Sequence, residues 1–308
     1  MIKTNNNKLA IIIPFYKDNF IRETLESVMN QTDKRFNLYI FNDGGKIDLK
    51  SLLKEYQQKE YLNFTYFVFP KNLGSISLTK HWERCIERVR DEDWFILLGD
   101  DDVLGNNVVS EFYEELNNFE NYTSLVRFSS YILDENNTIC SRIYTNPTWE
   151  KANNSYIRKL MNHTRSTLSE YIIKLSAFKK KGFRELPLAW HSDDALWLDL
   201  CEHTQQIYSI NTANIGIRMS HVNISGIKTN IQQKEEASRL FFNFLINVKG
   251  DLFHRLEKQI IFYYFEGYFF SNKTSHYEQI QFFKAIRRNS NICSALKIGL
   301  RLLFHKLH

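Results

Sequence analysis

The sequence predicts an α/β protein in which a mixed, largely parallel β-sheet is flanked by helices and followed by a helical C-terminal extension. Between residues 9 and 116, short apolar runs typical of buried strands alternate with segments whose apolar residues recur at helical spacing. From residue 232 onward the pattern is helical almost throughout. We therefore expect one sheet-containing domain at residues 1–230 and a helical, basic extension at residues 231–308.

The first predicted strand covers residues 9–14. Its run of Leu9, Ala10 and three isoleucines suits a strand that is buried on both faces of a parallel sheet, and Pro14 is expected to end it. The same reasoning extends the alternation along the chain. Further strands are predicted at 36–41, 64–69 and 94–98, and helices at 19–31, 49–60, 77–90 and 108–116.

The second half of the chain is less regular. Strands are predicted at 124–133 and 139–143. The polar stretch 145–154 is expected to be a loop and is a candidate mobile segment. Helical spacing resumes at 195–203 and again after residue 232, including the aromatic-rich stretch 260–270.

Composition and charge exclude several classes of protein. Hydrophobic residues make up 43% of the 308 residues and charged residues 24%, so the chain can bury a core and is not disordered. The formal net charge of +5 is unevenly placed, because residues 273–308 hold seven Lys or Arg and one acid. The remaining body is close to neutral. We therefore expect no nucleic acid partner.

The basic tail has an amphipathic pattern at 292–307. Leu296, Leu300 and Leu303 lie on one helical face, and Lys297 and Arg301 lie on another. Such a helix either rests on an anionic membrane surface or packs on the protein itself or on a second subunit. The tail therefore predicts either peripheral membrane contact or dimerisation through the C-terminal helices.

The cysteines and the N-terminus bear on location. Cys85, Cys140, Cys201 and Cys293 are far apart and form no CxxC pair, which favours small buried hydrophobes in a reducing compartment over a zinc site or disulfides. The apolar run at 9–15 is too short to cross a bilayer, and no signal peptide pattern precedes it. We expect a cytoplasmic protein, held on the inner face of the membrane if its tail binds there.

Three adjacent carboxylates, Asp100, Asp101 and Asp102, directly follow the predicted strand 94–98. They repel one another, and a folded protein tolerates this best around a cation. Mg²⁺ and Mn²⁺ prefer carboxylate oxygens, often together with phosphate oxygens. The triplet thus suggests a metal–diphosphate site. The alternative is an acidic turn that caps the helix beginning near Asn106.

Two further loops follow predicted strands, where ligands of parallel sheets bind. Asp43, between Asn42 and two glycines, can accept from a nucleotide base or a ribose, although this sequence is also a strong turn. The loop 70–75 precedes a helix that contains Lys80, and together they could hold phosphate. Helix capping is the alternative for this loop.

Two later motifs carry titratable side chains. Asp193 and Asp194 open a predicted helix, where they could serve catalysis or only cap the helix and complement its dipole. His221 could bind a metal or a phosphate, or could simply be a packed or surface histidine.

Taken together, these motifs resemble the family 2 glycosyltransferases of the GT-A (Rossmann-like) fold. The resemblance covers residues 8–226 with the motifs in the family's order. It rests on Ile12-Ile13-Pro14-Phe15-Tyr16, Asn42-Asp43-Gly44, Lys71-Asn72-Leu73-Gly74, Leu98-Gly99-Asp100-Asp101-Asp102-Val103-Leu104, Ser192-Asp193-Asp194-Ala195-Leu196-Trp197-Leu198 and Arg218 through Ser225.

The resemblance implies an inverting, metal-dependent glycosyltransferase with Mn²⁺ or Mg²⁺ as cofactor. Its donor would be a nucleoside-diphosphate sugar, with a UDP-sugar preferred, and its acceptor a glycan or a lipid-linked glycan in bacterial surface polysaccharide synthesis. Asp193 or Asp194 would be the general base. The metal ligands would come from Asp101, Asp102 and His221. The donor-binding residues would be Pro14, Tyr16, Asp43, Asn72, Gly74, Lys80, Asp100 and Asp101.

The chain departs from the family pattern at two positions. Gly99 stands where the usual Asp-x-Asp-Asp motif begins, so the metal-binding aspartate is open between Asp101 and Asp102. Ser192 replaces the Glu of the usual Glu-Asp pair, which leaves the base open between Asp193 and Asp194.

Two other functions stay open at this point. A nucleotidyltransferase-like enzyme would need a phosphate loop rich in Gly and Arg near the first strand, and residues 15–18 lack one. A non-catalytic nucleotide-sugar-binding homologue is conceivable because of Gly99.

Overall fold

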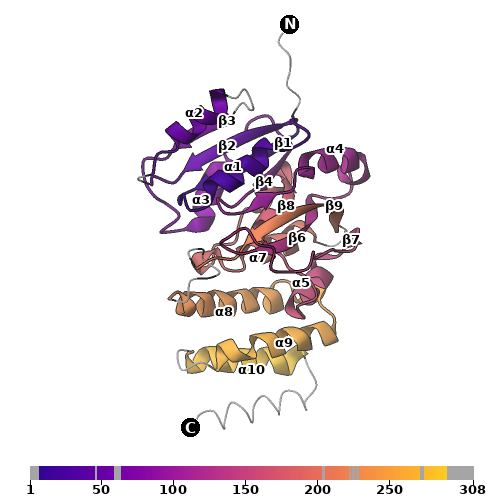
Figure 1. The fold of residues 1–308 in the computed structure, drawn as a ribbon. Coiled ribbons are helices and arrows are strands. Elements are labelled where there is room, and N and C mark those ends of the chain that lie inside the picture. The colour runs from indigo at the N-terminus through magenta and orange to yellow at the C-terminus, as the bar shows by residue number, and fades with distance from the viewer. Residues whose placement is uncertain are drawn as a thin grey trace.

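The computed structural model describes residues 7–45, 47–58, 64–202, 205–221, 223, 226, 229–270 and 274–289. A single mixed sheet runs through the first 218 residues in the order β3-β2-β1-β4-β8-β6-β9-β5, and β7 also pairs with β9. Helices cover the sheet, and the C-terminal helices stack below it with α8 nearest to the sheet-containing part (Figure 1). This architecture confirms the predicted fold class.

The first half of the sheet is parallel, as predicted. It consists of β1 (Leu9–Phe15), β2 (Phe36–Asn42), β3 (Phe64–Val68) and β4 (Trp94–Leu97). The second half is mixed, because β8 runs antiparallel to both β4 and β6. It consists of β5 (Val103–Leu104), β6 (Leu125–Leu133), β7 (Trp149–Glu150), β8 (Tyr171–Lys174) and β9 (Ile207–Arg218).

Strand β1 is continuously apolar because both of its faces are buried. Ile12 belongs to one apolar cluster and Ile11 to another, on opposite faces of the sheet. Pro14 does not end the strand as expected but lies inside it, opposite Phe41 of β2. Pairing with β4 stops at Ile12, so the missing N–H of Pro14 breaks no ladder on that side.

The helices also follow the predicted alternation in the first half of the chain. Their bounds are α1 (Ile21–Met29), α2 (Lys50–Gln58), α3 (Leu78–Ile86), α4 (Val108–Phe119), α5 (Ala152–Leu160), α6 (Leu175–Lys181), α7 (Ser192–Leu200), α8 (Ile231–Asn247), α9 (Arg255–Phe269) and α10 (His276–Asn289). Short 3₁₀ turns occur at η1 (Leu168–Glu170), η2 (Pro187–Ala189) and η3 (Gly250–Leu252).

Sequence reasoning was least accurate between residues 134 and 218. The predicted strand 139–143 is wrong, because this stretch forms only single bridges, Leu133–Ile139 and Ser130–Tyr144. The expected loop 145–154 instead contains β7 and the start of α5. Strands β8 and β9 were missed. Their residues pair with non-local partners, so local periodicity carries little of the signal.

The C-terminal helices share a core with the sheet-containing part. One apolar cluster contains Trp197 of α7, Phe241 and Phe242 of α8, and Phe265 of α9. The predicted boundary near residue 230 therefore crosses a continuous core, and the division into two units stays a prediction. The predicted amphipathic helix at 292–307 lies outside the described residues. Within the described ranges, no helix has the length and apolar character needed to cross a bilayer.

Candidate active site

The loops after the parallel strands meet at one edge of the sheet, as predicted. Asp100 follows β4, and its Oδ2 accepts hydrogen bonds from the backbone N–H groups of Tyr16 and Lys17 after β1, each at 3.0 Å. The Tyr16 ring lies against Gly45 after β2, and its side chain is half exposed. Asp100 therefore shapes the loop that presents Tyr16.

Asp43 is buried at the end of β2 and holds the loop after β3. Its carboxylate accepts from the backbone N–H groups of Leu73 (2.9 Å) and Gly74 (2.8 Å). Its Oδ1 also contacts His81 Nδ1 at 3.1 Å and the Arg84 guanidinium. A Cβ at Gly74 would lie 2.7 Å from Asp43 Oδ2, so this approach requires glycine. The structure gives Asp43 an anchoring role, and its predicted contact with the donor base stays a prediction.

Sequence reasoning missed Arg84. Spacing was the available signal, because His81 and Arg84 are three residues apart on α3 and so share one helical face. The pKa of His81 falls to about 4, mainly because burial disfavours the cation. A neutral His81 and a charged Arg84 thus face one carboxylate.

The other predicted donor residues have different surroundings. Pro14 lies near the end of β1. Asn72 Oδ1 accepts from the backbone N–H of Ser75 at 2.8 Å, which shapes its own loop. Lys80 Nζ lies 3.3 Å from Glu185 Oε2, and its side chain is 59% exposed. The structure therefore brings the predicted loops together, but Lys80 pairs at the surface.

Two carboxylates of the triplet converge over Gly99. A Cβ at Gly99 would lie 2.9 Å from Asp101 Oδ1 and 3.0 Å from Asp102 Oδ2. An aspartate at position 99, as in the usual family motif, would thus collide with this arrangement. Glycine at position 99 therefore leaves the space that the carboxylates of Asp101 and Asp102 occupy.

Arg218 at the end of β9 fixes the acidic loop. Its backbone N–H donates to Asp102 Oδ1 at 2.9 Å, and its Nε donates to the carbonyl oxygen of Asp101 at 2.8 Å. The guanidinium also donates to the carbonyl oxygen of Asp134 and to Asn137 Oδ1. Arg218 is 2% exposed. Its hydrogen bonds link the segments that follow β4 and β6 to the end of β9.

The charged forms of the carboxylates in the acidic loop are disfavoured. Burial, followed by repulsion from Asp101, raises the pKa of Asp102 to about 8 and that of Asp100 to about 6. Burial also raises the pKa of Asp101, against the hydrogen bond from Asn223 and the charge of Arg218. Two converging carboxylates whose charged forms are destabilised by burial are a donor set that fits a hard divalent cation.

The structure does not add His221 to these two carboxylates. Its ring Nδ1 contacts Glu135, and its side chain is 78% exposed. Among the residues that the structure describes, no three His, Cys, Asp or Glu side chains form a metal-binding group. The structure thus groups Asp101 with Asp102 and leaves His221 apart, and the metal assignment stays a prediction.

Asp193 and Asp194 begin α7 and differ sharply in their surroundings. Asp194 is 3% exposed, and its carboxylate accepts from Lys159 Nζ at 2.6 Å and contacts His191 Nδ1 at 3.1 Å. Burial raises the pKa of Asp194, but Lys159 and His191 outweigh it and lower that pKa overall. Asp194 is therefore an ionised, fully paired carboxylate.

Asp193 is suited to exchange a proton near neutral pH. Burial, followed by the charge of Asp194, raises the pKa of Asp193 to about 7, against the charge of Lys159. Its Oδ1 accepts the backbone N–H of Asp194 at 2.9 Å. Tyr156 of α5 is also electrostatically coupled to both carboxylates. A general base is most effective when its pKa is near the operating pH, so this pair separates into a base candidate and a support.

The turn η1 connects the two acidic groups. Ser169 Oγ accepts from the backbone N–H of Gly99 at 3.0 Å and also interacts with Asp102. The neighbouring Glu170 is buried and is coupled to Asp102 on one side and to Lys159 on the other. The acidic loop and the start of α7 therefore belong to one electrostatic site, although 90 residues separate them.

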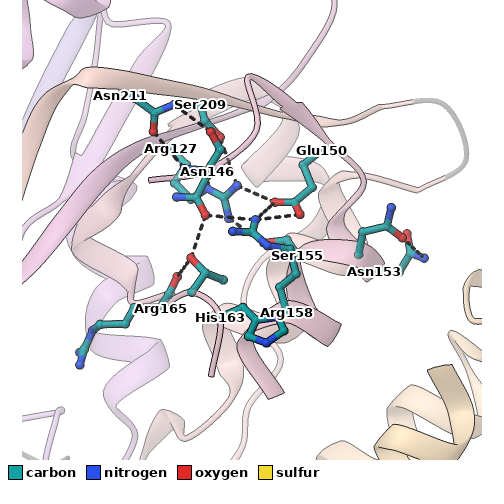
Figure 2. Close-up of polar contacts among 12 residues, drawn as sticks. Arg127, Asn146, Glu150, Asn153, Ser155, Arg158, His163, Arg165, Ser209 and Asn211 are labelled. Atoms are coloured by element: carbon teal, nitrogen blue, oxygen red, sulfur yellow. Dashed lines mark hydrogen bonds and ion pairs between the residues drawn. The ribbon is translucent and has the colours of Figure 1, made fainter. Parts of the chain in front are cut away.

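A buried ion network lies beside this site (Figure 2). Arg127 of β6 is fully buried and donates to Glu150 Oε2 at 2.8 Å, and Arg158 of α5 donates to both oxygens of Glu150 at 2.9 Å. Ser155 and Ser209 accept from Arg127 as well. This network joins β6, β7, α5 and β9, and so holds the helix that carries Lys159.

Arg165 projects away from that network (Figure 2). Its Nε is buried and has no hydrogen-bond partner among the described residues. Its charge nevertheless acts on Glu170, which is coupled to Asp102. Sequence reasoning missed Arg165. It is a cation in the charged neighbourhood of the acidic loop with bonding capacity left for an anion.

A family model described as Glycosyl transferase family 2 matches residues 10–186, more than half of the chain. The chain therefore belongs to glycosyl transferase family 2, which confirms the family resemblance.

Particular relatives support the same class. An uncharacterized glycosyltransferase of Rickettsia typhi is 24% identical over 269 residues, covering 84% of this chain and 81% of that protein. A teichoic acid poly(glycerol phosphate) polymerase of Staphylococcus epidermidis is 29% identical over 113 residues, covering 36% of this chain and 15% of that protein. The chain is thus a glycosyltransferase.

Solved structures of TarS from S. aureus share the fold. TarS residues 1–349 in complex with UDP-GlcNAc match with a TM-score of 0.65 and 17% identity, covering 91% of this chain and 79% of that chain. The same TarS segment in complex with UDP matches with a TM-score of 0.59 and 16% identity over the same shares. The GT-A-like α/β architecture with helices after the sheet is therefore shared.

Proposed function

We propose that this glycosyltransferase inverts the anomeric carbon as it moves a sugar from a nucleoside-diphosphate sugar to a hydroxyl of a glycan or lipid-linked acceptor. The observation that carries this proposal is the contrast at the start of α7. Asp193 has a pKa near 7, whereas the adjacent Asp194 is held ionised by Lys159 and His191. One carboxylate is therefore adapted to take up a proton and the other is not.

In the proposed step, the acceptor hydroxyl attacks the anomeric carbon while its proton passes to Asp193. Oδ1 of Asp193 already accepts the N–H of Asp194, so we assign Oδ2 to the acceptor hydroxyl. The new carbon–oxygen bond forms as the bond to the nucleoside diphosphate breaks. A single in-line displacement needs no protein nucleophile and inverts the configuration.

Charge on the leaving diphosphate would be met at the acidic loop. Asp101 and Asp102 would hold Mn²⁺ or Mg²⁺, and the cation would neutralise the charge that develops on the diphosphate. We propose that Arg165 supplies a second positive charge, because its Nε–H has no partner among the described residues and its charge acts on Glu170, which is coupled to Asp102. Asp100 and Asp43 would contribute by shaping the loops that carry Tyr16, Asn72 and Gly74.

A UDP-sugar is the preferred donor. TarS shares the fold of this chain, and its structures contain UDP-GlcNAc and UDP. Relatives include a polymerase of teichoic acid, a surface polymer, and we therefore place the acceptor in bacterial surface polysaccharide synthesis. Peripheral binding to the membrane through the basic tail would suit a lipid-linked acceptor.

The decisive experiment compares Asp193→Asn with wild type. Loss of the base should reduce kcat for sugar transfer by about 10²-fold or more, while the Kd for a UDP-sugar, measured by calorimetry with Mn²⁺, stays within about twofold. The donor is first chosen by a thermal-shift screen of UDP-, GDP- and dTDP-sugars. Wild-type turnover by Asp193→Asn would contradict this assignment.

A further inference from the structure

The C-terminal helix α8 reaches the residues that precede the proposed base. Ser238 of α8 is fully buried, and its Oγ lies 3.2 Å from His191 Nε2. Phe241, one turn further along α8, stacks on the His191 ring with centroids 4.7 Å apart and planes 9° apart. Two side chains of one helix therefore fix both the edge and the face of His191.

The backbone at His191 is also specialised. His191 has φ of 68° and is the residue before α7, and Leu188 and Ala189 just upstream have φ of 59° and 54°. Left-handed conformations cost energy for residues other than glycine and persist only where the surroundings enforce them. Three of them within four residues, directly before Asp193, show that this turn is held in one shape.

His191 in turn contacts the carboxylate of Asp194. Its Nδ1 lies 3.1 Å from Asp194 Oδ2, and the backbone N–H of Asp194 donates to Asp193 Oδ1 at 2.9 Å. Burial lowers the pKa of His191, which favours the neutral ring with its single proton on Nδ1 facing the ionised Asp194. Nε2 is then an acceptor that lies 3.2 Å from Ser238 Oγ, and the Ser238 hydroxyl also donates to the carbonyl oxygen of Lys234 at 2.8 Å within α8.

We propose that Ser238 and His191 are positioning residues for sugar transfer, so that α8 is part of the catalytic apparatus. They act through Asp194 on the proposed base, and neither is assigned contact with the substrate. This inference rests on the proposed function, because it gives α8 a role only if Asp193 is the base.

The test uses the full-length protein with Ser238→Ala and His191→Asn. Ser238→Ala removes one hydroxyl and little volume, and asparagine tolerates the left-handed conformation at position 191. Gln233→Ala, at an exposed position of the same helix, is the matched control. Each variant is assayed for kcat, for the KM of the UDP-sugar and for its thermal unfolding midpoint. The ¹³C-NMR titration midpoint of Asp193, assigned with Asp193→Asn, provides a readout that does not require turnover.

We expect kcat to fall about fivefold for Ser238→Ala and about tenfold for His191→Asn, with the donor KM unchanged. The Asp193 midpoint should move upward from about 7 in both variants, because the N–H of Asp194 is then held less well against its carboxylate. Gln233→Ala should behave as wild type.

The inference is overturned if Ser238→Ala and His191→Asn retain both the wild-type kcat and the wild-type Asp193 midpoint, or if kcat changes only in proportion to lost folded protein. A wild-type protein that turns over no nucleotide sugar would instead refute the proposed function. In that case the Asp193 midpoint alone decides whether α8 acts on this carboxylate.

Discussion

The two acidic regions of the site solve the problem of buried carboxylates in different ways. At the edge of the parallel strands, Asp43 and Asp100 accept backbone N–H groups of neighbouring loops, and Asp43 also pairs with Arg84 and His81. At the start of α7, Asp194 is balanced by the side chains of Lys159 and His191. The first arrangement shapes a surface for a ligand, and the second sets the protonation of one group.

The two regions also differ in how their titrating carboxylates are destabilised as anions. Burial raises the pKa values of Asp101 and Asp102, and repulsion from Asp101 raises that of Asp102 further. Burial, followed by the charge of the ionised Asp194, raises the pKa of Asp193. A bound cation would stabilise the carboxylates in the first case, and a pKa near 7 suits proton transfer in the second.

The largest expected effect tests the anchoring role of Asp43. Asp43→Ala leaves the guanidinium of Arg84 and the N–H groups of Leu73 and Gly74 without their acceptor, so we expect a loss of about 3–5 kcal/mol in the free energy of unfolding. Urea denaturation measures it. Asp91→Ala, at an exposed position before β4, is the control and should change stability by less than about 0.5 kcal/mol. Equal changes in the free energy of unfolding for the two variants would contradict the anchoring role of Asp43.

A second prediction concerns the other region. Lys159→Met removes a positive charge that lowers the pKa of Asp193, so that pKa should rise above 7. The base must be deprotonated to act. On acidification the variant should therefore lose activity at a higher pH than wild type does. The acidic limb of the kcat/KM profile should shift upward by about one unit. Lys151→Met, an exposed residue before the same helix, should leave the limb in place. If the acidic limb of the kcat/KM profile does not move in Lys159→Met, Lys159 does not influence the pKa of the proposed base.

A third prediction concerns the acidic loop. Asp102 has a native pKa of about 8 against an ordinary value of 3.8, so the folded state binds a proton that the unfolded state releases between these values. Its contribution to stability therefore falls as the pH rises from 4 to 8.

Without added metal, Asp102→Asn should unfold at a higher temperature than wild type at pH 8, and the difference should shrink at pH 5. Mn²⁺ should raise the unfolding temperature of wild type more at pH 8 than at pH 5, and should do so less in the variant. A pH-independent difference between the two proteins would contradict the charge argument.

Much of the parallel half could be predicted from the sequence because its signals are local. The apolar run at Leu9 and the turn at Asp43 mark strand ends without knowledge of their partners. Strands β8 and β9 were missed since their pairing is decided by distant segments. Arg84 had only its spacing from His81 as a signal and Arg165 had none, so the contact of Arg84 with Asp43 and the charge effect of Arg165 on Glu170 became known from the tertiary structure.

The sequence by itself determined the α/β class, the order of the motifs and the family, because strand ends and acidic loops are short-range patterns. Tertiary structure alone decided which aspartate is paired with a cation. Asp193 and Asp194 are adjacent and chemically identical, but Lys159 of α5 and His191, held by α8, pair with only one of them. The pKa of a carboxylate depends on burial and on charges within a few ångströms, and those neighbours come from distant parts of the chain.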